Sequence, residues 1–390
     1  MRFPVLSPRR LAAPAAIACA AALIPVASLA AVYPAALAKA GAATPAKAVP
    51  AGFAPVSASF LSPARGFVLG TVNCQTRRGC RARLAATADG AARWHAVTAP
   101  RVRLFNAGGN SLTQASRVTG VVFSSRRNGW LYGPGLWATH DGGRHWRRVI
   151  LGGNVVPSLG GGVVTMAAAS GNVYAVVSPD PFHGKPQEMY RSPAGQDAWA
   201  RVGTMTGDPF ASLAVSGKAA WFGTSTQLWA TADGVSWHEY PFGCPGAGYG
   251  LSGIAAASRS HVVFLCADAM GMFHTGKEVL RSVNGGKTEQ LAGQPPVGGD
   301  VTGGIAVPPH HSKVIGIAVV TPGPDFLYRS ASGGKTWTEI TIPGTSGGVN
   351  LNSLSYLSRT AGWVVAGSPG ETPTLLRTTD GGRTWHPVTF

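Results

Sequence analysis

The stretch "RTTDGGRTWHPV", residues 377–388, recurs in related forms along the chain and decides the fold. Six further copies align on its tryptophan position, with their last residues 38 to 53 residues apart. They are TADGAARW (87–94), THDGGRHW (139–146), SPAGQDAW (192–199), TADGVSW (231–237), SVNGGKTE (282–289) and SASGGKTW (330–337). A period of this size is typical of solenoid, propeller or array units.

The chemistry of the repeat predicts a tight hairpin turn. An aspartate carboxylate can accept backbone N–H groups two residues onward, glycine adopts the positive φ values of such a turn, and tryptophan buries a large ring. We therefore interpret the repeated positions as structural rather than catalytic. They are Asp89, Asp141, Asp233, Asn284, Asp380, Trp94, Trp146, Trp199, Trp237, Trp337 and Trp385.

Between the turns, the same order of segments returns in every unit. A strand of small residues such as "VTGVVFS" comes first, an apolar strand such as "GWLYG" second, a third leads into the turn, and a fourth follows its tryptophan. Four antiparallel strands in each of seven units predict an all-β, seven-bladed β-propeller. Blade 1 is complete over 56–98 and blade 7 over 354–390, so no swapped strand is expected. Trp130, Trp221 and Trp363 are predicted to pack between blades.

These repeats resemble the Asp-box family, also called BNR repeats, whose pattern is Ser/Thr-x-Asp-x-Gly-x-Thr-Trp. The copies of Asp141 and Asp380 fit closely, whereas Ala194, Asn284 and Ser332 replace the aspartate, Glu289 replaces a tryptophan, and the copy of Asp233 is one residue short. The family includes sialidases and is similar to the photosystem II assembly-factor propellers, which act as protein-binding scaffolds. A sialidase would carry an Arg-Ile-Pro signature, which this chain lacks, and six blades.

The N-terminal region predicts export. Residues 1–38 resemble a signal peptide, with Arg2, Arg9 and Arg10 before an apolar run and small residues at Ala36 and Ala38. Residues 39–54 form an Ala/Pro-rich linker, and residues 55–390 the propeller. The expected location is secreted or extracytoplasmic, and a retained membrane anchor is the alternative for the apolar run.

Four cysteines remain after the signal segment, an even number that suits an oxidising compartment. Three pairings are possible, and we favour Cys74 with Cys80 and Cys244 with Cys266 because they are nearest in sequence. Metal binding is the alternative, but neither pair has CxxC spacing and no histidine cluster accompanies them. No metal or other cofactor is expected.

Candidate catalytic acids are few. Of 16 acidic residues, those outside the repeated turns that could reach one face are Asp208, Asp268 and Asp300, and each stands where a turn is expected. Glycoside hydrolysis usually requires two facing carboxyl groups. We therefore assign no catalytic residue, and a glycosidase of exo-α-sialidase type is the alternative to a non-catalytic protein.

Charge is unevenly distributed. Residues 71–150 contain 13 arginines and two acids, whereas 151–390 contain 14 basic and 14 acidic residues. Arginine binds carboxylates and phosphates through a planar fork of donors. The sequence thus predicts a monomeric binding or assembly scaffold for a protein or an anionic polysaccharide rather than a nucleic acid, and a merely soluble basic surface is the competing interpretation. The candidate residues are Arg77, Arg78, Arg81, Arg83, Arg101, Arg103, Arg126 and Arg127.

Overall fold

Short apolar segments separated by glycine-rich turns form 28 β-strands, and the part of the chain described by the structure contains no helix. The structure is a computed structural model that describes residues 47–390 apart from 75–79, 105–116, 153–160, 180–184, 207–211, 225, 269–272, 324, 344, 346–350 and 368–372. The predicted signal segment therefore lies outside the described residues. In the described part, no helix is long and apolar enough to cross a membrane.

The strands form seven four-stranded sheets, and each sheet contains four strands that are consecutive in sequence. Blades 1 to 4 contain β1 (Phe53–Ser62), β2 (Arg65–Val72), β3 (Arg83–Thr87), β4 (His95–Val97); β5 (Gly120–Phe123), β6 (Gly129–Tyr132), β7 (Leu136–Thr139), β8 (Arg147–Val149); β9 (Gly162–Ala169), β10 (Asn172–Ser178), β11 (Gln187–Pro193), β12 (Ala200–Met205); and β13 (Ser212–Ser216), β14 (Ala219–Gly223), β15 (Gln227–Thr231), β16 (Trp237–Pro241). Blades 5 to 7 contain β17 (Tyr249–Ala256), β18 (Val262–Asp268), β19 (Lys277–Ser282), β20 (Gln290–Gly293); β21 (Asp300–Ala306), β22 (Ile315–Val320), β23 (Phe326–Ser330), β24 (Thr338–Thr341); and β25 (Leu351–Tyr356), β26 (Gly362–Ala366), β27 (Thr374–Thr378), β28 (His386–Pro387).

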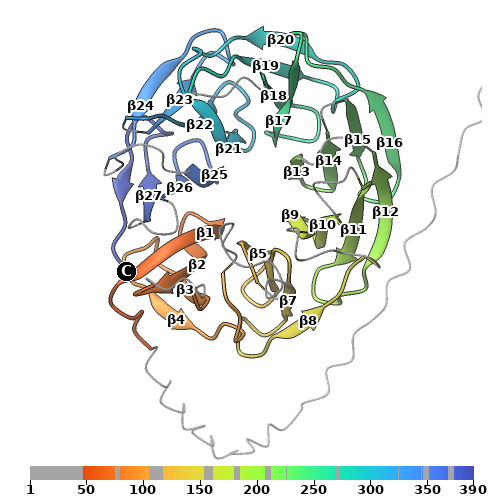
Figure 1. Ribbon diagram of the computed structural model, residues 1–390. Coiled ribbons are helices and arrows are strands. Elements are labelled where there is room, and N and C mark those ends of the chain that lie inside the picture. Colours follow the sequence, from red (N-terminus) through yellow and green to blue (C-terminus); the bar gives the residue numbers. More distant parts are fainter. Residues whose placement is uncertain are drawn as a thin grey trace, which may run out of the picture. The chain divides into compact units, whose positions relative to one another are not determined.

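The sheets are arranged around a ring with the first strand of each blade innermost (Figure 1). Neighbouring inner strands contact one another, and β25 of blade 7 contacts β1 of blade 1. The predicted seven-bladed propeller with four antiparallel strands per blade is confirmed. The absence of a swapped strand is confirmed as well, because β1 to β4 and β25 to β28 each form a complete sheet.

The hydrophobic core is divided among the interfaces between blades. Each of the seven buried clusters in the described chain combines residues from two neighbouring blades. Trp130, Trp221 and Trp363 are each at most 1% exposed and belong to three of these clusters. Their predicted packing between blades is therefore confirmed, and removal of apolar surface from water stabilises the ring one interface at a time.

Side chains take part in each of three contacts that close the ring between blades 7 and 1. Near the centre, the Ser353 hydroxyl accepts a hydrogen bond from Ala58 N–H at 3.3 Å. Further out, the Trp363 ring stacks on Phe60 with ring centroids 3.8 Å apart. At the outer turn, the Arg377 guanidinium donates to the carbonyl of Gly90 at 2.7 Å. The last contact is repeated between blades 6 and 7, where Arg329 donates to the carbonyl of Gly381.

All seven repeated turns connect the third and fourth strands of their blades, as predicted. We call them the tryptophan turns, although Glu289 replaces the tryptophan in blade 5. The reach of the aspartate differs from the prediction. The carboxylates of Asp89, Asp141 and Asp380 accept the N–H group four residues onward rather than two. The threonine hydroxyl two residues before each aspartate accepts the N–H group of Ala91, Gly143 or Gly382, so the two side chains together satisfy the turn. Only the short copy of Asp233 bonds two residues onward, to Val235 N–H.

Described residues before position 55 also contact blade 1. Strand β1 starts at Phe53, and Ala48 forms an isolated antiparallel bridge with His95 of β4. Ala96 N–H also donates to the carbonyl of Lys47. Within the predicted linker, Lys47 and Ala48 thus lie against the outer strand of blade 1 and cover part of its edge, while Phe53 and Ala54 belong to β1 and pair with β2.

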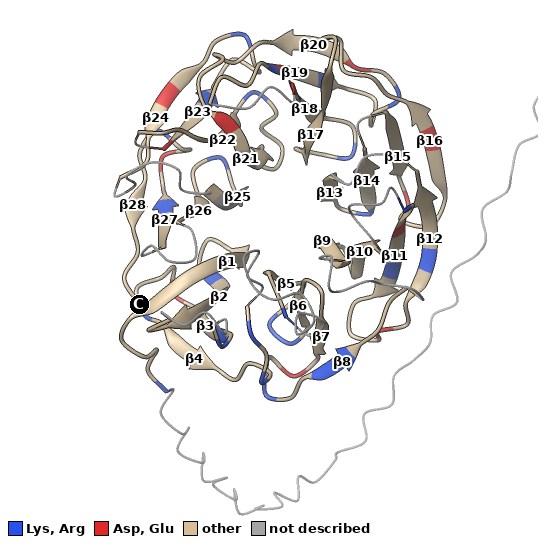
Figure 2. Ribbon diagram, in the orientation of Figure 1, with Lys and Arg blue, Asp and Glu red and all other residues tan. Residues whose placement is uncertain are grey.

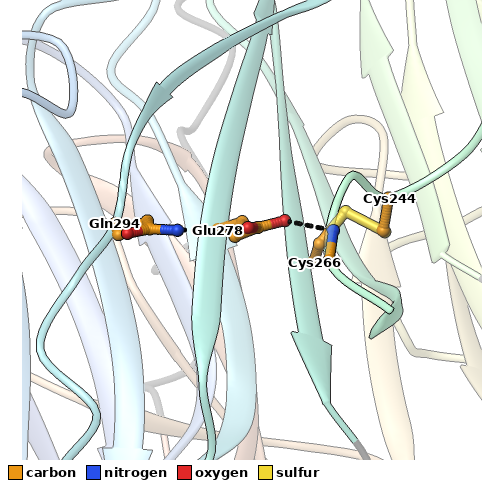
Figure 3. The surroundings of a disulfide bond; sticks show 5 residues. Cys244, Cys266, Glu278 and Gln294 are labelled. Carbon is orange, nitrogen blue, oxygen red and sulfur yellow. Dashed lines mark hydrogen bonds between the residues drawn. A yellow bond between two sulfur atoms is a disulfide. The ribbon is translucent and has the colours of Figure 1, made fainter. Parts of the chain in front are cut away.

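Both predicted disulfides are present. Cys74 and Cys80 close the connection between β2 and β3, and Cys244 and Cys266 tie the β16–β17 connection to β18. Glu278 of β19, which pairs with Cys266, also holds the β16–β17 connection (Figure 3). Its carboxylate accepts hydrogen bonds from Gly246 N–H at 3.0 Å and Gln294 Nε2 at 3.2 Å. Covalent and hydrogen bonds therefore fix the same loop.

Candidate anion-binding surfaces

The predicted arginines lie at two opposite ends of the blades. In an antiparallel sheet, successive connections alternate between the two ends of the strands. Arg81, Arg83, Arg101 and Arg103 lie in or beside the β2–β3 and β4–β5 connections, at one end. Arg126 and Arg127 lie in the β5–β6 turn, at the end that carries the tryptophan turns. Arg77 and Arg78 lie outside the described residues.

We call the first group the arginine ribbon, defined as residues 80–83 and 101–104. Its two segments pair antiparallel, with Arg81 opposite Arg103. Ala82 N–H donates to the carbonyl of Val102, and Leu104 N–H to that of Cys80. Ala82, Val102 and Leu104 are buried, whereas the four arginines between and beside them are exposed. The alternation of strands therefore turns all four arginine side chains toward solvent.

The pairing within the ribbon places like charges close together. The hydrogen bonds on either side of Arg81 and Arg103 make them a non-hydrogen-bonded pair, in which side chains approach most closely. Like charges directly opposite each other destabilise a strand pair. The Cys74–Cys80 disulfide anchors the ribbon immediately before Arg81. The disulfide thus anchors a strand pair on which two arginines stand opposite each other.

The second group lines an open pocket in blade 2. Two turns contribute its walls, the β5–β6 turn and the tryptophan turn between β7 and β8, and its volume is about 440 Å³. We call it the arginine pocket, which is lined by Ser125, Arg126, Arg127, Asp141 and Arg144. Basic segments on β8 and in the turns beside it lie near this part of the ring, while inner strands such as β5, β9, β13 and β17 carry no charge (Figure 2).

The arginine ribbon and the arginine pocket act as separate electrostatic surfaces. They are separated by the length of a blade, and strands rise about 3.3 Å per residue, so β3 alone spans roughly 15 Å. Exposed charges are screened beyond about 8 Å at physiological salt. The predicted arginines therefore form two local surfaces, each of which requires its own test.

A buried ionic cluster beside the arginine pocket was not foreseen from the sequence. Asp197, whose side chain is 1% exposed, lies in the tryptophan turn of blade 3 and contacts His140 and Arg147 of blade 2. It also accepts a hydrogen bond from the Trp130 indole at 3.1 Å. Burial opposes ionisation, but these hydrogen bonds and the Arg147 charge lower the pKa of Asp197. The cluster joins two blades. Its sign in the sequence was that blade 3 has Ala194 at the usual aspartate position of the turn and an aspartate three residues later.

Two of the three candidate catalytic acids, Asp268 and Asp300, hold the connection between β18 and β19. Asp300 accepts hydrogen bonds from Phe273 N–H and the Thr275 hydroxyl, and Asp268 accepts one from Gly276 N–H. Asp300 is also the one acidic residue in the seven inner strands as the structure bounds them. Asp208 lies outside the described residues. Within the described part, no group of three His, Cys, Asp or Glu residues could hold a metal ion.

Lys277 is a buried cation that the sequence analysis did not single out. It is 2% exposed, and its ammonium donates to the carbonyls of Thr275, Pro296, Val297 and Gly298 at 2.6 to 3.3 Å. It also lies over the Tyr328 ring at 5.5 Å. Burial lowers its pKa from 10.5 to about 8, although the nearby negative charges of Asp300 and Asp268 act to raise it. Three of these carbonyls belong to the loop between β20 and β21, which the ammonium therefore holds in place.

We expect the stability of the protein to rise between pH 8 and pH 10 because of Lys277. Its pKa is lower in the folded than in the unfolded chain, so the unfolded chain binds the proton more tightly in this range. Raising the pH therefore removes a penalty on folding. Melting temperatures measured across the range should show a rise that the Lys277→Met variant lacks. Parallel curves for the two proteins would contradict the assignment.

Comparisons with known proteins show the fold. No family model matches the chain, and no curated protein matches it. Among solved structures, "YCF48 bound to D1 peptide" is 17% identical, with a TM-score of 0.53, covering 86% of this chain and 94% of that one. The PL25 ulvan lyase bound to -[GlcA(1-4)Rha3S]- is 8% identical, with a TM-score of 0.54 and coverages of 88% and 94%. The Pyrococcus horikoshii acylaminoacyl peptidase is 8% identical, with a TM-score of 0.50 and coverages of 87% and 52%.

These likenesses extend to binding and to enzymatic propellers alike. At such low identities they establish a shared β-propeller architecture and no shared residue role. The function must therefore be argued from the surfaces of this chain.

Proposed function

We propose that the protein is an exported, non-catalytic propeller that binds an anionic partner, either an acidic protein or an anionic polysaccharide. One observation carries the proposal: the arginine ribbon presents four exposed arginines on one side of a disulfide-anchored strand pair. Export is supported by the signal-like segment and by the two disulfides, which persist in oxidising compartments.

The ribbon suits an extended ligand with repeated anionic groups. Arg81 and Arg83 are two residues apart, which corresponds to about 7 Å along a strand. Arg81 and Arg103 lie opposite each other across the pair. Each guanidinium can engage a carboxylate, sulfate or phosphate group through two parallel hydrogen bonds. A bound polyanion would neutralise the closely spaced arginines. Any repulsion between them in the free protein would therefore favour binding.

Two structural neighbours show that related rings can hold ligands of both proposed kinds. One was solved with a peptide and the other with a -[GlcA(1-4)Rha3S]- saccharide. They support the plausibility of a binding role for this fold and do not select between a protein and a glycan. A sialidase-type glycosidase is the alternative, and turnover of a sialoside that disappears in Asp300→Ala or Asp208→Ala would overturn the scaffold proposal.

We expect the triple variant Arg81→Ser, Arg83→Ser, Arg101→Ser to lose most retention on an anionic polysaccharide support. If each arginine contacts one anionic group of a flexible polyanion, the slope of log affinity against log salt should fall by roughly 2. Folding should be preserved, since the three side chains are exposed and the change removes like-charge repulsion. Salt-gradient elution of both proteins and a thermal melt measure these effects.

The matched control removes the same charge from the opposite end of the propeller. Arg259, Lys335 and Arg359 are exposed in the turns of blades 5, 6 and 7. Their replacement by Ser should change retention little, because the ribbon is untouched. Equal losses in both triple variants would show that retention reports net charge alone and would refute a specific role for the ribbon.

A further inference from the structure

The arginine pocket is built on a rigid turn. The Ser125 hydroxyl accepts hydrogen bonds from Arg127 N–H at 3.2 Å and Asn128 N–H at 3.0 Å. The carbonyl of Arg127 accepts Gly142 N–H at 2.9 Å, which fastens this turn to the tryptophan turn of the same blade. The backbone that carries Arg126 and Arg127 is thereby fixed before any ligand arrives.

A second series of side-chain contacts runs from this turn to blade 3. The Asn128 side chain lies 3.1 Å from Nδ1 of His140, and Nε2 of His140 lies 2.8 Å from the buried carboxylate of Asp197. The pocket is therefore supported from two sides, which reduces the ordering cost that a ligand must overcome.

The pocket carries an excess of positive charge. Three guanidinium groups, those of Arg126, Arg127 and Arg144, line it together with one carboxylate, that of Asp141, which leaves a net charge of +2. Within the described part of the chain, these three guanidinium groups make no hydrogen bond or ion pair. Asp141 is bound by its own turn, through Thr139 and His145. The N–H group of His145 holds the pKa of Asp141 well below its usual range, so its charge persists.

Comparison with equivalent turns in the same chain isolates Arg127 as the unusual residue. The serine-capped turn recurs in blade 5 around Ser258 and in blade 7 around Ser358, with the same N–H donors two and three residues onward. Arg126 corresponds there to Arg259 and Arg359, and Arg144 to Lys287 and Arg383; two cations are thus common to the repeat. Arg127 corresponds to Ser260 and Thr360. Blade 2 therefore adds a third cation where the repeat needs only a small polar residue.

We propose that the arginine pocket of blade 2 binds a phosphate monoester group, at a site separate from the ribbon and independent of the function proposed above. A phosphate monoester carries about −1.5 to −2 charges at neutral pH and three acceptor oxygens, which match a net charge of +2 and three guanidinium donors. A carboxylate would neutralise half of that charge. The open pocket of about 440 Å³ admits a compact group, whereas the ribbon suits repeated anions.

Isothermal titration calorimetry of the mature protein with inorganic phosphate and with glycerol 3-phosphate tests the proposal. We expect both to bind more tightly than acetate, and binding of glycerol 3-phosphate to weaken below about pH 6 as its dianion takes up a proton. Tighter binding of glycerol 3-phosphate would assign the pocket to an ester, and tighter binding of inorganic phosphate to the free ion. No binding, or equal binding of acetate, would overturn the proposal.

Arg127→Ser is the decisive variant because the equivalent turn in blade 5 already carries serine. It should fold normally and lose at least tenfold in phosphate affinity, since a hydrogen bond to a charged group contributes about 1.5–3 kcal/mol. Arg359→Ser, at the position in blade 7 that matches Arg126, should leave the affinity unchanged. Arg127→Thr repeats the test with the residue of blade 7. Unchanged affinity in both Arg127 variants would refute the site.

The ribbon variant separates this inference from the proposed function. Replacement of Arg81, Arg83 and Arg101 should remove most polysaccharide retention and preserve phosphate affinity, because the two surfaces lie at opposite ends of the blades. Phosphate affinity that falls with the ribbon variant would show that phosphate binds at the ribbon, and would contradict the pocket assignment alone.

Discussion

Trp363→Ala should lower the free energy of unfolding by about 3–5 kcal/mol, the range for replacing a buried tryptophan with alanine. Trp363 is 0% exposed, stacks on Phe60 and lies under the Arg377 guanidinium at 5.4 Å from the ring centroid. Its loss opens a cavity at the one interface that joins the two ends of the propeller. Guanidinium unfolding followed by far-UV circular dichroism measures the change without depending on tryptophan fluorescence.

Comparison with Trp221 provides the control. The Trp221 indole donates to the carbonyl of Gly285 at 2.8 Å, whereas the Trp363 indole makes no hydrogen bond in the described structure. Replacement by phenylalanine keeps an aromatic ring at both positions but removes a hydrogen bond only at Trp221. Trp363→Phe should therefore cost about 1 kcal/mol less than Trp221→Phe. The reverse order would contradict the description of the interface.

Removal of the Cys244–Cys266 bridge is the second large effect that we expect. The cysteines are 22 residues apart, and the chain entropy lost on closing a loop of that length corresponds to about 3 kcal/mol. Cys266 is also fully buried, so Cys→Ala substitutions are preferable to serine, which would bury a hydroxyl. Thermal melts of the double Cys→Ala variant, compared with the oxidised protein, measure the loss.

The Cys74–Cys80 bridge is the matched comparison, because it closes a loop of six residues. The same relation gives about 2 kcal/mol for its removal. Glu278 continues to hold Gly246 after the longer bridge is removed, so its loop should stay folded at low temperature. A larger loss from the shorter bridge would show that local strain or packing, rather than chain entropy, sets the stabilisation.

The blade count and the position of the tryptophan turns could be predicted because both depend on local turn chemistry that repeats at a regular spacing. Glycine positions such as Gly142 and Gly381 have φ values of 79° and 77°, which a sequence pattern can anticipate. The reach of Asp141 to the fourth residue onward could not be read from the pattern, since it depends on how the turn curls. The disulfides could be predicted because the paired cysteines are near each other in sequence, and the antiparallel strands keep them near each other in space.

The candidate site was predicted less well because charge was counted along the sequence. The alternation of strand directions separates Arg81 from Arg126, although both belong to one basic stretch of the chain. The role of Asp197 was beyond sequence reasoning, since its partners His140 and Arg147 lie some fifty residues earlier in another blade. Arg127 could have been found by aligning the three serine-capped turns. The reason to align them became clear only from their shared geometry in the structure.

Each blade is one unbroken stretch of sequence, and this has a consequence for how such a chain can change. Phe53 and Phe390 contact each other with ring centroids 4.7 Å apart, so the two ends of the propeller already meet. The chain could be circularly permuted at any connection between blades without taking a strand from its sheet. Duplication or deletion of a gene segment can likewise add or remove a whole module, whereas a ring sealed by a shared blade would have to keep its seam where it is.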